Sequence, residues 1–215
     1  MIDAHCHIPR GDSSRRFVIG VDFVGIHPWE TFEMGSVPID RLAEFSARLA
    51  SDENLGVGEI GMDRLKNSEI SPVMRDTFIA QLELAAKFRR RVVLHGAKCW
   101  GQVVAECRRH VGVIPAFLFH GFSRSGGLLG DMAALNGFVS VGPAVLNDHA
   151  VNYRELVKKI PAEMLLLETD RTVENEAECP AIEEIARKVA ELRGLSIEEL
   201  EALIERNAER FCGNS

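Results

Sequence analysis

Short apolar runs alternate with longer amphipathic stretches along the whole chain, and this alternation restricts the fold more than any other feature of the sequence. Apolar runs separated by helix-length stretches are typical of βαβ units, in which helices cover a parallel sheet. The sequence therefore predicts the α/β class. We interpret seven runs as parallel strands, namely residues 1–5, 17–26, 55–60, 90–95, 114–120, 137–142 and 164–169.

Helix boundaries are visible between these runs. Ser71 is suited to cap a helix whose first position is Pro72. A second helix is expected to end at Gly194, because glycine adopts the left-handed conformation that terminates many helices. Ser196 and Glu199 have the spacing of a capping box, which predicts a last helix directly afterwards.

One domain over residues 1–215 is expected, because 46% of the side chains are hydrophobic and neither a repeat nor a low-complexity linker divides the sequence. The net charge of -7 argues against a broad basic face for duplex DNA, but it permits a small cationic site for one phosphate. Five cysteines without a CxxC spacing indicate free thiols in a reducing compartment. We expect a cytoplasmic protein without a membrane segment, and no protein partner is indicated.

Side chains that can bind a metal stand where the predicted strands end. They are His5, His7, His27, Glu59, His95, His120 and Asp170. The carboxyl ends of parallel strands meet at one edge of the sheet, where ligands and catalytic groups gather. Alternation along the first strand also directs both histidines of "DAHCH" to the same side. We therefore expect these side chains to converge on one site.

The donor types indicate two divalent ions. Four imidazoles and two carboxylates suit zinc or manganese better than calcium, which prefers oxygen ligands. Cys6 lies between the first two histidines and is expected to point away from the site. Six donors exceed the three or four that one catalytic zinc uses, so the surplus predicts two ions that share a carboxylate. The predicted ligands are His5, His7, Glu59, His95, His120 and Asp170.

Seven motifs resemble the TatD-like metal-dependent hydrolases, the family of the TatD deoxyribonucleases. They are "DAHCH", "GIHPW", "GEIGMD", "VVLH", "FHGFS", "LLLETD" and "NAERF", in family order between Ile2 and Phe211. The resemblance implies a distorted TIM-type barrel with a dinuclear site that holds zinc, magnesium or manganese. It also implies phosphodiester hydrolysis, because the better-studied members are deoxyribonucleases and often 3′ to 5′ exonucleases.

The resemblance also assigns roles to residues. It makes His5 and His7 ligands of one ion. It makes His95 and His120 ligands of the other ion, with Glu59 as the bridge between the two.

Asp170 would bind the first ion, hold the attacking water and accept its proton, so that Asp170 and Glu59 are the predicted catalytic residues. Asp63 matches an acidic residue of the family that orients a ligand or caps a helix. His27 either contacts substrate or a nearby water, or it forms a rigid turn packed under Trp29.

Cations near the site mouth are expected to hold the substrate. Family members often carry an arginine two residues after the "VVLH"-type histidine, where this chain has Ala97 followed by Lys98. A glycine usual after "HxFS" is replaced by Arg124, and Arg171 follows "ETD". We predict substrate contacts from His27, Lys98, Arg124 and Arg171. Arg124 is favoured, since its planar fork can hold two phosphate oxygens.

Only twenty positions separate His7 from His27, where family members usually carry a complete strand and helix. We therefore predict that one β/α unit is reduced, in agreement with the seven strands.

Three functions are open at this point. The first is a dinuclear phosphodiesterase, specifically a deoxyribonuclease, acting on DNA or a small phosphodiester. The second is an amidohydrolase-like enzyme that cleaves an amide, a lactone or a phosphotriester, although such enzymes commonly use a modified lysine on the strand that here supplies Glu59. The third is an inactive metal-binding scaffold, which the complete ligand set disfavours.

Overall fold

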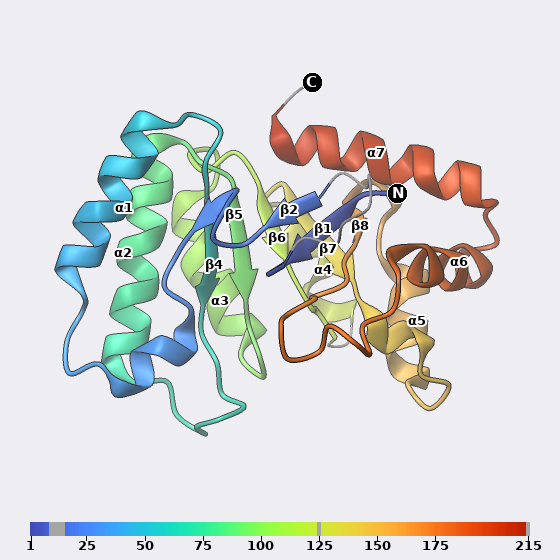
Figure 1. Cartoon of the computed structure of the whole chain (residues 1–215), viewed down its shortest axis with the longest axis horizontal. Helices are drawn as coiled ribbons and strands as arrows, with labels where there is room; N and C mark the ends of the chain where they lie inside the picture. The colour runs from blue at the N-terminus through green and yellow to red at the C-terminus, as the bar shows by residue number, and fades with distance from the viewer. Residues whose placement is uncertain (9–15, 124–125, 214–215) are drawn as a thin grey trace.

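The computed structural model describes residues 1–8, 16–123 and 126–213, and it confirms the α/β class (Figure 1). Strands β3 to β8 form one parallel sheet in chain order, and β1 pairs with β2 in a parallel two-stranded sheet. The strands are Asp3–Cys6 (β1), Arg16–Val18 (β2), Phe23–Val24 (β3), Gly56–Gly61 (β4), Val92–His95 (β5), Phe117–Phe119 (β6), Gly137–Val141 (β7) and Leu165–Leu167 (β8).

The two sheets together make a TIM-type barrel that is not fully closed. At one junction, the Asp170 N–H donates to the His5 carbonyl at 3.0 Å and the His7 N–H donates to the Arg171 carbonyl at 2.8 Å, so β1 lies beside the segment that follows β8. At the other junction, an isolated bridge joins Ile19 to Phe23. A closed barrel would have a continuous row of strand-to-strand hydrogen bonds at each junction, but among the described residues only a few hydrogen bonds join the two sheets.

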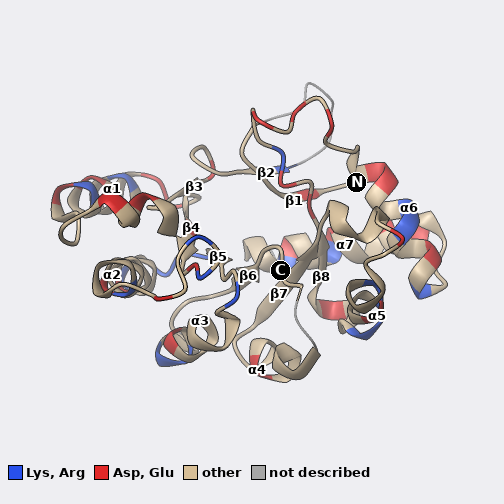
Figure 2. Ribbon diagram, turned by 90° about the horizontal axis from the view of Figure 1, so that it is seen from below, with Lys and Arg blue, Asp and Glu red and all other residues tan. Residues whose placement is uncertain are grey.

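Helices cover the outer side of the six-stranded sheet, and β1 and β2 face it from the opposite side (Figure 2). The α-helices are Ile39–Ser51 (α1), Pro72–Phe88 (α2), Trp100–Cys107 (α3), Leu129–Ala133 (α4), Val151–Lys159 (α5), Ile182–Arg193 (α6) and Ile197–Cys212 (α7). Short 3₁₀ helices span Pro28–Glu33 (η1), Arg108–His110 (η2), Gly126–Leu128 (η3), Pro143–Leu146 (η4) and Ala162–Met164 (η5).

The predicted helix boundaries are confirmed. The Ser71 hydroxyl accepts a hydrogen bond from the Met74 N–H at 3.1 Å and caps α2. Gly194 ends α6 with φ of 66°, in the left-handed region that glycine adopts without steric cost. Ser196 and Glu199 form the expected capping box at the start of α7.

The apolar run 17–26 differs from the prediction, because the structure divides it into β2 and β3, and the described residues therefore form eight strands instead of seven. Gly20 turns the chain with φ of 86°, and the Asp22 carboxylate accepts a hydrogen bond from the Val18 N–H at 2.7 Å. This turn interrupts an otherwise continuous apolar stretch. In the described residues 16–27, β2 passes to β3 without a helix, as a reduced β/α unit requires.

Helix α7 closes the amino end of the barrel, at the top of Figure 1. The Asn207 amide donates to the carbonyl of Leu165, where β8 begins, at 2.8 Å. The Phe211 ring lies 5.7 Å from the rings of Phe17 and Phe138 and 6.3 Å from that of Phe23. This aromatic cluster joins the last helix to strands of both sheets.

Within the described residues, every helix is too short or too polar to cross a bilayer. All five cysteines lie in the described residues, and none forms a disulfide. The expected location in the cytoplasm stays a prediction.

Candidate metal centre

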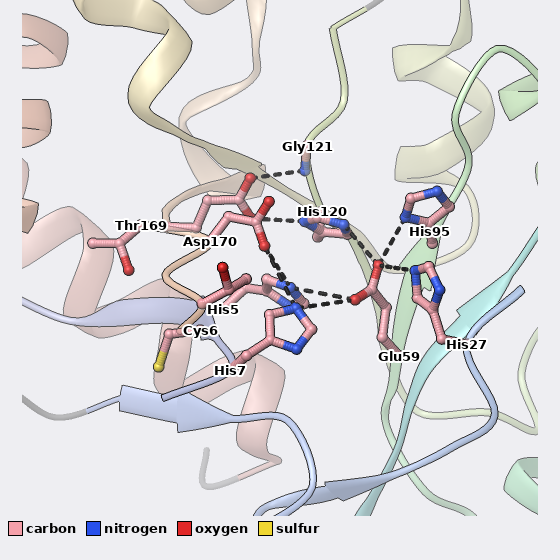
Figure 3. A network of polar contacts seen from close by, with 12 residues as sticks. His5, Cys6, His7, His27, Glu59, His95, His120, Gly121, Thr169 and Asp170 are labelled. Carbon is pink, nitrogen blue, oxygen red and sulfur yellow. Dashed lines mark hydrogen bonds and ion pairs between the residues drawn. The ribbon is translucent and has the colours of Figure 1, made fainter. Parts of the chain in front are cut away.

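The side chains predicted from the strand ends come together around Glu59 (Figure 3). His5 lies in β1, Glu59 lies in β4 and His95 is the last residue of β5, while His120 directly follows β6. Asp170 lies three residues beyond β8. Parallel strands deliver their carboxyl ends to one face of a barrel, and this topology gathers residues that are far apart in the sequence.

The two carboxylate oxygens of Glu59 face different histidines. Oε2 lies 3.5 Å from Nε2 of His5 and 3.5 Å from Nε2 of His7, and we call these two residues the first histidine group. Oε1 lies 2.8 Å from Nδ1 of His95, 2.8 Å from Nε2 of His120 and 3.5 Å from Nε2 of His27. We call these three residues the second histidine group. Glu59 is 3% exposed, so it separates the two groups as a buried carboxylate.

Asp170 adds a second carboxylate beside the first histidine group. Its Oδ1 lies 3.3 Å from Nε2 of His5 and 3.6 Å from Nε2 of His7. The side chain is 46% exposed, so it lies between the buried His5 imidazole and solvent. Its backbone adopts φ of 48°, a left-handed conformation that aspartate and asparagine tolerate better than most residues.

The donor atoms fit divalent metal ions. Within the described residues, three overlapping groups have ligand atoms within 4.8 Å of one another, namely His5, His120 and Asp170; His5, His7 and Glu59; and His27, Glu59 and His95. Both ring nitrogens of His5 are buried without a hydrogen-bond partner. A buried polar atom normally has a partner, so the His5 imidazole has the coordination capacity that a metal ion would use.

Supporting carboxylates hold two of the histidines. Asp63 is fully buried, and its Oδ2 lies 2.7 Å from Nε2 of His95 and accepts a hydrogen bond from the Trp29 indole at 2.8 Å. Glu168 lies 3.4 Å from Nδ1 of His120. The expected orienting role of Asp63 agrees with this geometry, because such contacts fix the ring position of a metal-binding histidine.

Two supporting residues were missed from the sequence, and both could have been found by the alternation of side chains along a strand. Asp3 stands two positions before His5 and accepts hydrogen bonds from the N–H of Thr169 at 3.0 Å and its hydroxyl at 2.6 Å. Glu168 stands two positions before Asp170. It accepts hydrogen bonds from the Ser140 hydroxyl and from the Gly121 N–H, so it is fixed beside His120.

Charges within the centre shift the proton equilibria of its members. Burial alone would raise the pKa of Glu59, but the imidazoles, His120 foremost, hold this pKa well below its ordinary value. Burial alone would lower the pKa of His120, but Glu59 and Glu168 raise it well above its ordinary value. The contact with Asp170 raises the pKa of His7. Protons on the imidazoles therefore supply the positive charge that a metal ion would replace.

Cys6 points away from the centre, as expected (Figure 3). Its thiol is 3.7 Å from the carbonyl of Phe17, and burial raises its pKa to about 12. A thiol that stays protonated is a poor metal ligand.

A cavity of about 500 Å³, which we call the catalytic cavity, opens beside the centre. It is lined by Leu65, His95, Gly96, Ala97, Lys98, Trp100, His120, Gly121, Ser123 and Asp170. The predicted substrate contact Lys98 is exposed at this cavity. His27 does not line the cavity and instead joins the second histidine group.

The other two predicted substrate contacts lie elsewhere. The Arg171 guanidinium forms an ion pair with Glu176 at 2.6 Å, and Arg171 is not among the described residues that line the catalytic cavity. Arg124 lies outside the described residues.

An α/β barrel whose strand ends gather five histidines and two carboxylates has the architecture of a metal-dependent hydrolase. The family model of the TatD related DNases matches residues 12–213, and the chain belongs to this family. The match begins after His5 and His7, which the structure places in the centre with the residues of the matched segment.

Relatives and a solved structure agree with this membership. The uncharacterized metal-dependent hydrolase YabD of Bacillus subtilis is 24% identical over 197 residues, which cover 87% of this chain and 75% of the relative. The 3'-5' ssDNA/RNA exonuclease TatD of Klebsiella pneumoniae is 29% identical over 202 residues, 88% of this chain and 75% of the relative. The crystal structure of YJJV, a TatD homolog from Escherichia coli, has a TM-score of 0.80 at 20% identity and covers 98% of this chain and 96% of its own.

Replacing Asp63 by asparagine is expected to weaken metal binding by about 10- to 100-fold, the usual cost of losing a group that orients a metal-binding histidine. The amide keeps the size of the side chain, but it loses the charge that faces His95 and one of the two oxygens that accept hydrogen bonds from the Trp29 indole and the Leu65 N–H. Competition with a chromogenic chelator measures the affinity. Asp148→Asn is the matched control, because that exposed carboxylate pairs only with Arg154 among the described residues. Equal affinities of the two variants would contradict an orienting role.

Proposed function

We propose that the chain is a phosphodiesterase with a dinuclear metal site, specifically a deoxyribonuclease that removes nucleotides from a single strand in the 3′ to 5′ direction. The observation that carries this proposal is the position of Glu59, whose two oxygens face two separate histidine groups. A carboxylate placed in this way can bridge two ions. The Klebsiella relative is named as a 3'-5' ssDNA/RNA exonuclease, which supports a nucleic-acid substrate.

Each histidine group would hold one ion. His5 and His7, with Asp170 and Oε2 of Glu59, would bind the first. The second would be held by Oε1 of Glu59 and the second histidine group, His27, His95 and His120. Imidazole-rich sites favour zinc or manganese, while magnesium prefers oxygen ligands and keeps several waters. When bound, such a pair of ions lowers the pKa of a water toward neutrality and stabilises charge on the phosphate.

The chain's own residues would then manage the proton and the substrate. Asp170 reaches the catalytic cavity and would accept the proton of the attacking water through its carboxylate. Burial alone would raise the pKa of Asp170, but His5 and His7 hold it below its ordinary value, so the carboxylate is available as a base. Lys98, exposed at the same cavity, would pair with a phosphate oxygen.

A metal-reconstitution experiment tests this function. The protein is stripped with a chelator, reloaded with zinc, manganese or magnesium, and analysed for metal per chain and for hydrolysis of bis(4-nitrophenyl) phosphate and a single-stranded oligonucleotide. Two ions per chain and cleavage of both substrates are expected. A single ion at saturation would contradict the bridged site. Turnover of amides or lactones in place of phosphodiesters would favour the amidohydrolase-like alternative.

Metal binding is expected to release protons and to weaken as the pH falls. The pKa values of His7, His95 and His120 are raised, so these imidazoles still carry protons above the ordinary value of about 6.5 and must lose them to bind a metal. Glu59, with its lowered pKa, stays anionic over the same range. Zinc titration calorimetry between about pH 6 and pH 8, in buffers of different ionisation enthalpy, measures both effects. An affinity independent of pH would show that these imidazoles are not ligands.

A further inference from the structure

A second depression adjoins the catalytic cavity. It has a volume of about 480 Å³, and we call it the side hollow. Lys98 and Trp100 line both spaces, so the side hollow continues the catalytic cavity across the start of α3. Arg64, on the loop after β4, and Gly101 also line the side hollow.

The side hollow is positively charged, although the chain carries a net charge of -7. Arg64 and Lys98 are both exposed there, and the described residues that line the hollow include no carboxylate. Helix α3 directs its amino end into the same space, and Cys99 offers no side-chain cap to its first turn. The positive end of the helix dipole at such an amino end favours an anion.

The backbone of the side hollow is accessible at two glycines, and the Trp100 ring beside them is packed in the core. A Cβ added to Gly101 or to Gly127 would meet no atom within 4 Å, so a ligand can approach the backbone at both positions. Trp100 is 4% exposed, and its ring packs 5.8 Å from that of Phe119 and 5.6 Å from that of Phe122. The shared wall between the two spaces is therefore anchored in the core.

We propose that the side hollow binds a second phosphate of a single-stranded nucleic acid whose scissile phosphodiester lies in the catalytic cavity. This inference rests on the proposed function and adds that the enzyme holds at least two successive phosphates. Lys98 lies between the two positions and Arg64 holds the outer phosphate, with the amino end of α3 as a further donor. Two point contacts to consecutive phosphates orient a strand without reading its bases.

Gly101→Asp is the sharpest test, with Gly101→Asn as its uncharged control of equal size. Both side chains enter open space at the second position of α3, where an acidic residue favours the helix, so both variants are expected to fold. The aspartate is expected to raise the KM for a thymidine trinucleotide about tenfold relative to the asparagine variant. The KM for bis(4-nitrophenyl) phosphate, which carries one phosphate, is expected to change far less.

Binding supplies a second readout that is independent of hydrolysis. Anisotropy of a fluorescein-labelled oligothymidylate with a phosphorothioate backbone gives the affinity as a function of salt. Arg64→Gln is expected to reduce the slope of log affinity against log salt by about 0.7, the value for one phosphate contact on a single strand. Arg64→Lys keeps the charge while losing the hydrogen bond to the Ser68 carbonyl, so it separates charge from loop structure.

The outcomes distinguish the two proposals. If bis(4-nitrophenyl) phosphate is hydrolysed but Gly101→Asp and Gly101→Asn have the same trinucleotide KM, the side hollow is not a phosphate site and the proposed function stands. If no phosphodiester is cleaved, the proposed function fails. The slope of log affinity against log salt for Arg64→Gln still tests whether the side hollow binds a phosphate. An unchanged slope overturns the inference.

Discussion

Replacement of Asp170 by asparagine is expected to lower the rate of phosphodiester hydrolysis by about 10²- to 10⁴-fold, while the chain keeps its fold and most of its metal. The amide keeps an oxygen beside His5 and His7 but cannot accept a proton from water. Asparagine also tolerates the left-handed backbone at this position, which alanine would strain. The lower hydrolysis rate of this variant would therefore measure the loss of the proton acceptor and not a change in backbone conformation.

The measurement is kcat on bis(4-nitrophenyl) phosphate, with metal content determined on the same samples. Glu178→Gln neutralises an exposed carboxylate that follows β8 in the same loop, and it serves as the control. A rate for Asp170→Asn within a few-fold of the control would show that another group accepts the proton.

Glu59→Gln is expected to remove one of the two ions and to weaken binding at the affected position by at least about 100-fold. A glutamine presents one oxygen and one NH₂ group, so only one of the two histidine groups would keep an oxygen donor opposite it. The NH₂ group would face the other ion with its hydrogens. Hydrolysis is expected to fall with the lost ion, because in-line displacement uses both.

Elemental analysis of metal per chain, at increasing free zinc, measures this loss. Glu106→Gln is the matched control, since Glu106 is a buried glutamate that pairs with Arg75 away from the centre. Glu59→Asp keeps both oxygens on a shorter side chain and is expected to recover part of the metal binding. Two ions bound to Glu59→Gln with the affinity of the control would contradict the bridging role.

The convergence of the candidate ligands could be predicted from the sequence because it depends on topology. Once the runs are read as parallel strands, His95 and His120 must meet at one edge, whatever the loops do. His27 is expected at the same edge, but its position 3.5 Å from Oε1 of Glu59 could not be predicted in the same way. It stands just before η1, and its imidazole reaches Glu59 only because a turn at Pro28 directs it inward.

Tertiary contacts explain the remaining differences. The run 17–26 is apolar throughout, so periodicity alone reads it as one strand, whereas Gly20 and the hydrogen bond between Val18 and Asp22 divide it. Arg171 follows a ligand in the sequence, yet its Nη2 donates to the Glu176 carboxylate and its side chain does not line the catalytic cavity. A residue that follows a predicted ligand in the sequence is therefore expected near the site. The direction of a long side chain at that position depends on which loop residues it contacts.

Helix α7 and the Phe211 cluster stabilise one end of the barrel, and the metal centre occupies the other. Mutations at the two ends therefore act on separate properties, because additivity holds for distant sites without shared partners. A lineage can remodel the loops around Lys98 to suit a new substrate without loosening the closure by α7. An engineer who seeks a more heat-tolerant variant should begin at the amino end, where better packing does not trade against turnover.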